Sequence, residues 1–425
     1  MDKMAGSVAD GVADVVLRWF QASAVCQKKH PPTEWTVIAG IVSAFRVLAC
    51  ATGTKCLGRR DLDTRGLVVN DCHAEILARR ALLRFLYTEA LAPCGDAAIY
   101  QLREDIIDEL VKQRRPPEKR FDQMVGIARV KSGRSDLPPD KQTLSMSCSD
   151  KLAKWNAVGI QGTLLLQWYE PLFLRSIVVS CDDTCVSTAA QYEALERAIC
   201  CRFKESSWLQ QRSEDKESAL LPTCALHIIA REFPCKKPPT AAPDSARKVP
   251  SSLALNWSTH MAHWHSTIAS ETLYDTSHHF AAADTQHEVR LATLLKKFFQ
   301  TQDVEVLMGA TGLKQGAKRL SKMTDIETQR VASRVAKWTF FLAFRHIVAM
   351  ESALDDADAG VSRTFSLSYA AAKDAIPIAA SSSTPTQNKS TSSKAIDCIR
   401  ERRQGFLTAI KGWVGVPHTY KQFSI

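Results

Sequence analysis

The stretch "NDCHAEILARRALLRFLY", Asn70–Tyr87, constrains the fold more than any other part of the chain. Its apolar residues recur at the three-to-four-residue spacing of an amphipathic helix, and Asn70 or Asp71 can cap the helix start. The apolar stretches "EWTVIAGIVSAFRV" and "RGLVVND" before it carry the β-branched residues typical of buried strands. We therefore predict an α/β protein in which this helix packs on a sheet, with His73 and Glu75 at its first turn.

Other segments fit the same class of fold. The start of the chain, "MDKMAGSVADGVADVVLRWF", indicates an amphipathic helix, and "REDIIDELVKQRR" and "ETQRVASRVAKWTFFLAFRHIVAM" also have helical spacing. The stretch "LSMSCSDKLAKWNAVGIQGTLLL" predicts a strand end, a cysteine, a helix, a glycine turn and an apolar strand. We predict one domain over residues 1–425, with disordered insertions at 235–252 and 379–394, which are rich in proline, serine and threonine.

Charge and cysteine content limit the class of protein. Lysine and arginine outnumber aspartate and glutamate by 55 to 45, which favours a polyanionic partner such as RNA or a phosphorylated small molecule. The 13 cysteines follow no disulfide framework, and no secretory apolar region precedes them. No apolar run approaches the roughly 20 residues that span a bilayer. We expect an intracellular monomer with no membrane partner.

His73 and Glu75 can be interpreted together with two cysteines that lie farther along the chain. A lone His-x-Glu is usually a core histidine beside an exposed carboxylate, but Cys94 in "APCGD" and Cys148 in "MSCSDK" add two thiols. One histidine and two cysteines are a set of three Zn²⁺ ligands that leaves the fourth position to water. Zinc lowers the pKa of that water towards about 7. Glu75 would then carry protons between the water, the substrate ring and the leaving amine, as in zinc nucleobase deaminases.

The blocks "HAE", "PCGD" and "SCSDKLAKWNAVGIQGTLL" resemble the adenosine deaminases acting on RNA, from about Trp35 onward. The resemblance implies a cytidine-deaminase-like mixed sheet flanked by helices, with helical C-terminal additions. Ala98 stands where the duplex-editing enzymes generally have an arginine, and no double-stranded RNA-binding domain precedes "TGTKC". Their base-flipping loop is also missing before "TLSMSCSDK". The tRNA-specific members are therefore favoured, which implies adenosine-to-inosine conversion 3′ of the anticodon in alanine tRNA, with the anticodon arm as partner.

The same resemblance implies a buried inositol hexakisphosphate. The positions that match its ligands are Lys55, Asn70, Arg79, Arg80, Ser145, Lys151, Lys154, Gly162, Thr163, Lys337, Tyr369, Lys373 and Trp413. After Trp413 the chain departs from the usual charge pattern of the family. Buried cations without counter-charge would each be destabilising by several kcal/mol, and a bound polyphosphate would offset this.

Two alternatives stay open: a catalytically inactive scaffold that binds RNA or inositol phosphate, and an enzyme that edits adenosine in duplex mRNA. A second metal site is not expected from His260, His263 and His265, or from Cys181 and Cys185 in "CDDTC". Helix or loop histidines without a carboxylate or a fixed second shell seldom bind metal.

The spacing of the zinc ligands is itself unusual. Cys94 follows His73 by only 21 residues, where relatives have a longer segment. A helix from His73 to Glu89 would rise about 24 Å, and an extended return would need about seven residues. Only Ala90–Pro93 remain for it. The spacing therefore predicts a displaced Cys94, or a chain that has lost a segment.

Overall fold

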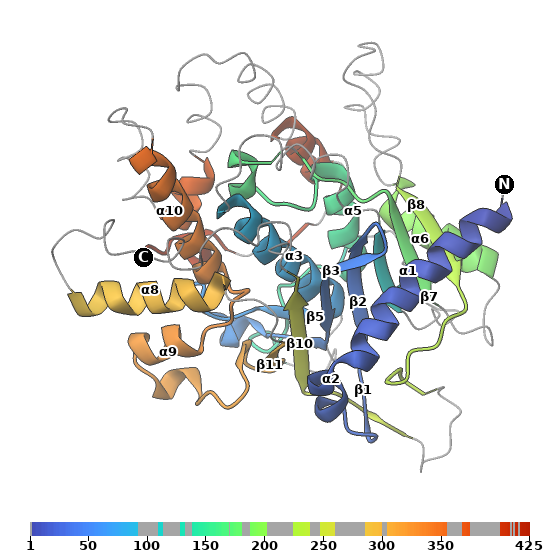
Figure 1. The fold of residues 1–425 in the computed structure, drawn as a ribbon, viewed down its shortest axis with the longest axis horizontal. Helices are drawn as coiled ribbons and strands as arrows, with labels where there is room; N and C mark the ends of the chain where they lie inside the picture. Colours follow the sequence, from blue (N-terminus) through green and yellow to red (C-terminus); the bar gives the residue numbers. More distant parts are fainter. Residues whose placement is uncertain are drawn as a thin grey trace.

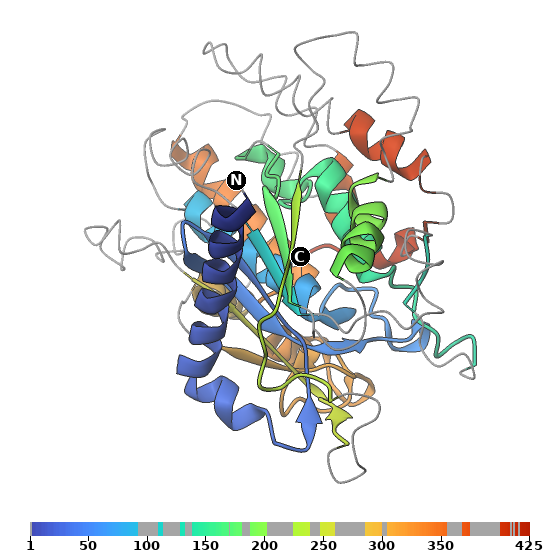
Figure 2. The same cartoon turned by 90° about the vertical axis from the view of Figure 1, so that its right-hand side faces the viewer.

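The computed structural model describes residues 2–91, 109–113, 128–131, 138–169, 171–180, 188–201, 224–238, 247–259, 285–299, 304–354, 368–374, 400–408, 410, 413–414 and 417–425. An eight-stranded sheet crosses the domain, and helices cover both of its faces (Figures 1 and 2). This arrangement confirms the predicted α/β fold of a mixed sheet flanked by helices.

The large sheet combines antiparallel and parallel strands. Its strands, in spatial order, are β12 (Leu313–Lys314), β11 (Glu305–Met308), β10 (Leu253–Ser258), β3 (Arg46–Thr52), β2 (Ile38–Ser43), β6 (Glu109–Gln113), β7 (Ser176–Ser180) and β8 (Ala225–Ile229). β6, β7 and β8 run parallel, and the other pairs are antiparallel. Two small sheets pair β1 (Glu34–Trp35) with β9 (Val249–Pro250), and β4 (Thr54–Cys56) with β5 (Asp71–His73).

Side chains of β2 and β3 alternate between two cores. Ala39 and Ile41 face the core of α3 (Ala74–Leu91), whereas Ile38 and Cys50 face that of α1 (Asp2–Ala22). The other helices are α2 (Ala24–Lys29), α5 (Cys148–Val158), α6 (Thr188–Ile199), α8 (Thr285–Phe299), α9 (Asp325–Val331) and α10 (Lys337–Leu354), with 3₁₀ turns η1 (Arg59–Asp61), η3 (Leu164–Gln167), η9 (Leu320–Lys322) and η11 (His418–Lys421). Residues 369–374 and 400–408 are also helical. No helix in the described part of the chain is long and apolar enough to cross a membrane.

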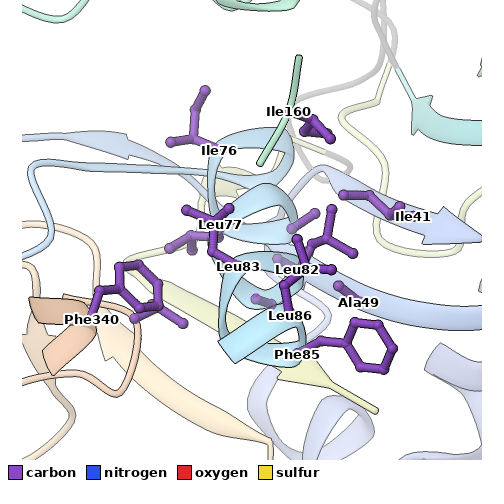
Figure 3. Close-up of a cluster of buried hydrophobic side chains, with 14 of the residues drawn as sticks. Ile41, Ala49, Ile76, Leu77, Leu82, Leu83, Phe85, Leu86, Ile160 and Phe340 are labelled. Carbon is purple, nitrogen blue, oxygen red and sulfur yellow. The ribbon is translucent and has the colours of Figure 1, made fainter. Parts of the chain in front are cut away.

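α3 is the central helix of the domain. Leu77, Leu82, Phe85 and Leu86 are completely buried along it, and Figure 3 shows Leu82 and Leu86 on the side of the helix that faces β2 and β3. A helix that is apolar on most of its surface is packed on most of its surface. α3 therefore holds its length and direction firmly, and this matters for the ligand at its start.

Several predicted elements differ in the structure. The stretch "RGLVVND" is irregular up to Asp71, because the backbone of Val69 bonds to Gly312 rather than to a neighbouring strand. The helix predicted over "REDIIDELVKQRR" is wrong for residues 109–113, which form β6 between β2 and β7. Residues 164–167 form a 3₁₀ turn and not a strand. Tertiary pairing overrides local preference in each case.

The long helix predicted over "ETQRVASRVAKWTFFLAFRHIVAM" is two helices, α9 and α10. Buried Glu305 accepts a hydrogen bond from the backbone of Arg334 and another from the Ser333 hydroxyl, and this polar contact interrupts the helix. The insertion predicted at 235–252 is also too long: Val249–Pro250 pair with β1, whereas residues 239–246 lie outside the described part of the chain. The second predicted insertion, 379–394, lies wholly outside it.

Candidate active site

Two predicted zinc ligands line one cavity. His73 is the last residue of β5, directly before α3, and Cys148 is the first residue of α5. Both border a cavity of about 230 Å³ together with Arg129 and Lys131. The position of Cys148 at a helix N-terminus favours a negatively charged sulfur, because the helix dipole is positive there.

Asp71 fixes the orientation of His73. Its Oδ1 lies 2.9 Å from Nδ1 of His73 and also accepts a hydrogen bond from the His73 backbone, 3.1 Å long. A carboxylate on Nδ1 leaves Nε2 as the nitrogen that can bind a metal or substrate, as in metal sites generally. The sequence prediction missed Asp71, although strand alternation places residues 71 and 73 on one face of β5.

Asp71 also joins the site to three further side chains. It accepts hydrogen bonds from Lys131, 2.8 Å away, from Ser145 at 2.6 Å, and from Lys151. Burial by itself would raise the pKa of Asp71, but Lys131 and Lys151, and then His73, hold it well below its ordinary value. These cations therefore favour the ionised form of Asp71.

Glu75 lies in the first turn of α3 and is 1% exposed. It is not among the residues that line the cavity, but it is close enough to Lys131 to affect it. Burial lowers the pKa of Lys131, yet the negative charges of Asp71, Cys148 and Glu75 together raise it above its ordinary value. These three groups thus stabilise one ammonium at the cavity wall.

The third predicted ligand, Cys94, lies outside the described residues, and α3 continues to Leu91, three residues before it. Within the described ranges, no group of three or more His, Cys, Asp or Glu side chains is arranged to hold a metal ion. His73 and Cys148 alone do not make a zinc site of the predicted type. The other candidate metal residues, His260, His263, His265, Cys181 and Cys185, also fall outside the described part of the chain.

A second cavity, of about 360 Å³, adjoins Asp71 on the side of Lys151. The predicted polyphosphate ligands that line it are Asn70, Arg79, Arg80, Ser145, Lys151, Lys154, Gly162, Thr163, Lys337, Lys373 and Trp413. We call this the polycation cavity. Lys55 and Tyr369 do not line it: Lys55 packs against Gly309, and the Tyr369 ring lies 5.4 Å from the ammonium of Lys373. Arg403 lines it and was not predicted.

The backbone aims two guanidinium groups into the polycation cavity. Nε of Arg79 donates to the carbonyl of Ile160 at 2.7 Å, and Nε of Arg80 donates to that of Val335 at 2.6 Å. Nη2 of Arg80 is buried and has no hydrogen-bond partner among the described residues. Gly162, with φ of +81°, leaves room for Arg79, whose Nη2 would lie 3.1 Å from an added Cβ.

The cations of this cavity are held in an unfavourable environment. Burial, followed by repulsion from neighbouring cations, lowers the pKa of Lys154 and Lys337 to about 7, and that of Lys373 to about 8. The same two causes lower the pKa of Arg79 to about 10. Asp71 is the only carboxylate among the described lining residues. These residues fit an anion with several charges.

The family model of the adenosine-deaminase (editase) domain matches residues 49–92 and 89–302, which is more than half of the chain. The chain belongs to this family. The two matched segments of the editase domain meet at residues 89–92, where α3 ends.

Relatives of the editase domain act on different RNAs, according to their names. The chain is 33% identical to tRNA-specific adenosine deaminase 1 of Drosophila melanogaster over 261 residues, which are 48% of this chain and 62% of the relative. It is 29% identical to the same-named protein of Macaca fascicularis, over 54% of this chain and 42% of the relative. Double-stranded RNA-specific editase Adar of Drosophila melanogaster is 29% identical over 47% of this chain and 36% of its own length. The match thus covers less than two thirds of each relative.

Proposed function

We propose that this editase domain converts adenosine to inosine in RNA by hydrolysis, with tRNA as its substrate. The observation that carries the proposal is the convergence of His73, Cys148 and the Lys131 ammonium on one cavity, with buried Glu75 beside it. The tRNA-specific relatives support tRNA, and the adenosine 3′ of the anticodon in alanine tRNA is the proposed position.

The roles of the chain's own residues follow from their surroundings. Glu75 takes one proton from the attacking water and passes it to the ring nitrogen N1 of adenine while the C6–O bond forms. It then takes the proton of the new C6 hydroxyl and gives it to the amino group, so that the C6–N bond breaks, ammonia departs and inosine remains. Asp71 positions the His73 ring. Arg129 and Lys131 at the cavity wall attract the phosphates that flank the target nucleotide in the anticodon arm.

We propose inositol hexakisphosphate as the occupant of the polycation cavity. Buried cations that repel one another are destabilising unless a counter-charge is present. A compact polyphosphate provides this charge and accepts hydrogen bonds from guanidinium groups such as that of Arg80. The proposal predicts that the purified protein carries the polyphosphate with it, because the buried cations that line the cavity repel one another without it.

The polyphosphate proposal predicts a specific pH dependence of stability. In the ligand-free fold, Lys154 and Lys337 have a pKa of about 7, against an ordinary value of 10.5, so the unfolded chain binds more protons between these limits. Ligand-free stability therefore rises as pH increases from about 7 towards 10. Added inositol hexakisphosphate should raise the melting temperature most near pH 7, and progressively less towards pH 10.

Melting curves with and without inositol hexakisphosphate, from pH 7 to 9.5, test this dependence. At a ligand concentration 1,000-fold above Kd, binding to the folded state contributes about 4 kcal/mol. The double variant Lys154→Met/Lys337→Met should show a flatter pH profile without ligand. A ligand effect that grows with pH would contradict the assignment of these lysines.

A scaffold without catalysis is the second candidate, and the length of α3 favours it, because the described residues bring only His73 and Cys148 of the three predicted ligands to one cavity. Editing of duplex mRNA is the third, and the match to the Adar editase supports it over a smaller part of the relative. These candidates differ in the RNA that is converted and in whether any conversion occurs.

Inosine mapping distinguishes them. Total tRNA and a long RNA duplex are incubated separately with the purified chain, and with a form whose connection after Leu91 is lengthened, and inosine is identified by sequencing as guanosine. We expect inosine in tRNA from the lengthened form, and little inosine in the duplex from either form. Conversion of the duplex alone would support mRNA editing, and binding of tRNA without inosine from either form would support the scaffold.

A further inference from the structure

α3 links the ligand His73 to the segment that carries Cys94, so its length decides whether both residues can bind one ion. The helix runs unbroken from Ala74 to Leu91, 18 residues (Figure 1). At about 1.5 Å per residue, Leu91 lies about 27 Å from His73 along the helix. The three peptide units from Leu91 to Cys94 reach at most about 11 Å, whatever path they take.

This distance is too great for a shared zinc ion. Even a segment that turned straight back along α3 would leave the Cα atoms of His73 and Cys94 about 16 Å apart. Zn–N and Zn–S bonds of about 2.1 and 2.3 Å, added to the two side-chain lengths, allow a separation of at most about 11 Å. Thus an α3 that ends at Leu91 leaves too short a connection for Cys94 to share an ion with His73 and Cys148.

The last turns of α3 are also firmly packed, so the helix does not shorten readily. Phe85 and Leu86 are fully buried, and Tyr87 is 2% exposed, with its ring stacked 5.7 Å from Phe340. The hydroxyl of Tyr169 donates to the carbonyl of Leu86 at 2.8 Å. Figure 3 shows Phe85 and Leu86 at this end of the helix. Unwinding residues 84–91 would remove these contacts from the core.

Two other cysteines lie close to His73 in the sequence or the sheet, and neither replaces Cys94. Cys72 precedes His73 in β5, so its side chain points to the opposite face, where it is buried in the α3 core. Cys56 pairs with Asp71 across β4 and β5 but forms no metal-binding group with the described residues.

We infer that this chain does not close a zinc site from His73, Cys94 and Cys148, because the connection after Leu91 is too short, while the cavity lined by His73 and Cys148 and the polycation cavity are both built. All three predicted ligands are present in the sequence, and what prevents the site is the short length of the connection between Leu91 and Cys94. The inference rests on the proposed function for the identity of the ligands. It makes the chain, as it stands, a zinc-poor member of its family.

The test lengthens the connection and measures metal content. An insert of about 12 glycine and serine residues after Leu91 exceeds the roughly eight extended residues that a return of about 27 Å requires. The full chain is expressed in zinc-containing medium, and zinc per molecule is measured by elemental analysis after gel filtration. A control carries the same insert after Gly316, where an added Cβ meets no atom within 4 Å.

We expect less than about one tenth of a zinc ion per molecule in the original chain and in the Gly316 control, and close to one in the chain lengthened after Leu91, at least a tenfold increase. Cys94→Ser in the lengthened chain should return zinc to the original value. Full zinc occupancy of the original chain that is lost in Cys94→Ser would overturn the inference, and so would a lengthened chain that stays zinc-free. A lengthened chain that holds zinc but forms no inosine would instead contradict the proposed deaminase function.

Discussion

Glu75→Gln, made in the chain lengthened after Leu91, is expected to reduce inosine formation by about 10²–10⁴-fold, the range typical of a lost general acid–base group. Glutamine keeps the shape of the side chain but cannot carry a proton. Zinc content should not change, because Glu75 is predicted to act beside the metal and not as a ligand. Single-turnover inosine formation, with zinc measured on the same sample, tests this.

The matched control is Glu89→Gln, at the other end of α3 and away from both cavities. It should convert tRNA at the rate of the parent chain. Equal rates for Glu75→Gln and Glu89→Gln would remove Glu75 from the proposed chemistry, and loss of zinc in Glu75→Gln alone would make it a ligand.

Charge reversal in the polycation cavity should have the largest effect on folding. Arg79→Glu together with Lys151→Glu removes two cations from the proposed polyphosphate and also deprives Asp71 of its Lys151 partner. Two buried carboxylates are added where Asp71 already stands. Breaking a buried ion pair typically lowers the free energy of unfolding by about 3–5 kcal/mol, which is a large share of the total stability of a domain. We expect insoluble protein.

Soluble yield and phosphate content check this prediction. The control Lys28→Glu/Arg46→Glu changes the net charge equally at exposed positions and should remain soluble. A milder variant, Lys337→Met/Lys373→Met, should stay soluble with reduced polyphosphate content and a lower melting temperature. A folded Arg79→Glu/Lys151→Glu protein without bound phosphate would show that the ligand is not needed for folding.

The sequence was most informative where local pattern and environment agree. The amphipathic helix at the start of the chain is α1, and the helix predicted after Cys148 is α5, capped by the Ser147 side chain. Most residues matched to the polyphosphate ligands line one cavity, and Arg79, Arg80, Lys151 and Lys154 among them follow the spacing of the helices α3 and α5. Lys55 and Tyr369 are not among the lining residues: Lys55 packs against Gly309, and the Tyr369 ring lies 5.4 Å from the ammonium of Lys373.

Long-range contacts account for what the sequence did not indicate. The five residues of β6 have helical spacing, and only their pairing between β2 and β7 makes them a strand. Lys131 and Arg403 occur in stretches without a recognisable pattern, and their roles depend on Asp71 and the polycation cavity. The distance that the chain must cover from the end of the helix back to His73 is longer in the structure than predicted, since the helix extends to Leu91 rather than Glu89.

Inosine mapping on alanine tRNA, after incubation with a preparation of the lengthened chain that holds close to one zinc ion per molecule, tests the proposed deaminase site. We expect inosine at the adenosine 3′ of the anticodon, and none above background with the Glu75→Gln counterpart. Absence of inosine from every tRNA position in a zinc-loaded, polyphosphate-containing preparation would contradict the assignment of the His73 and Cys148 cavity as an adenosine deaminase site.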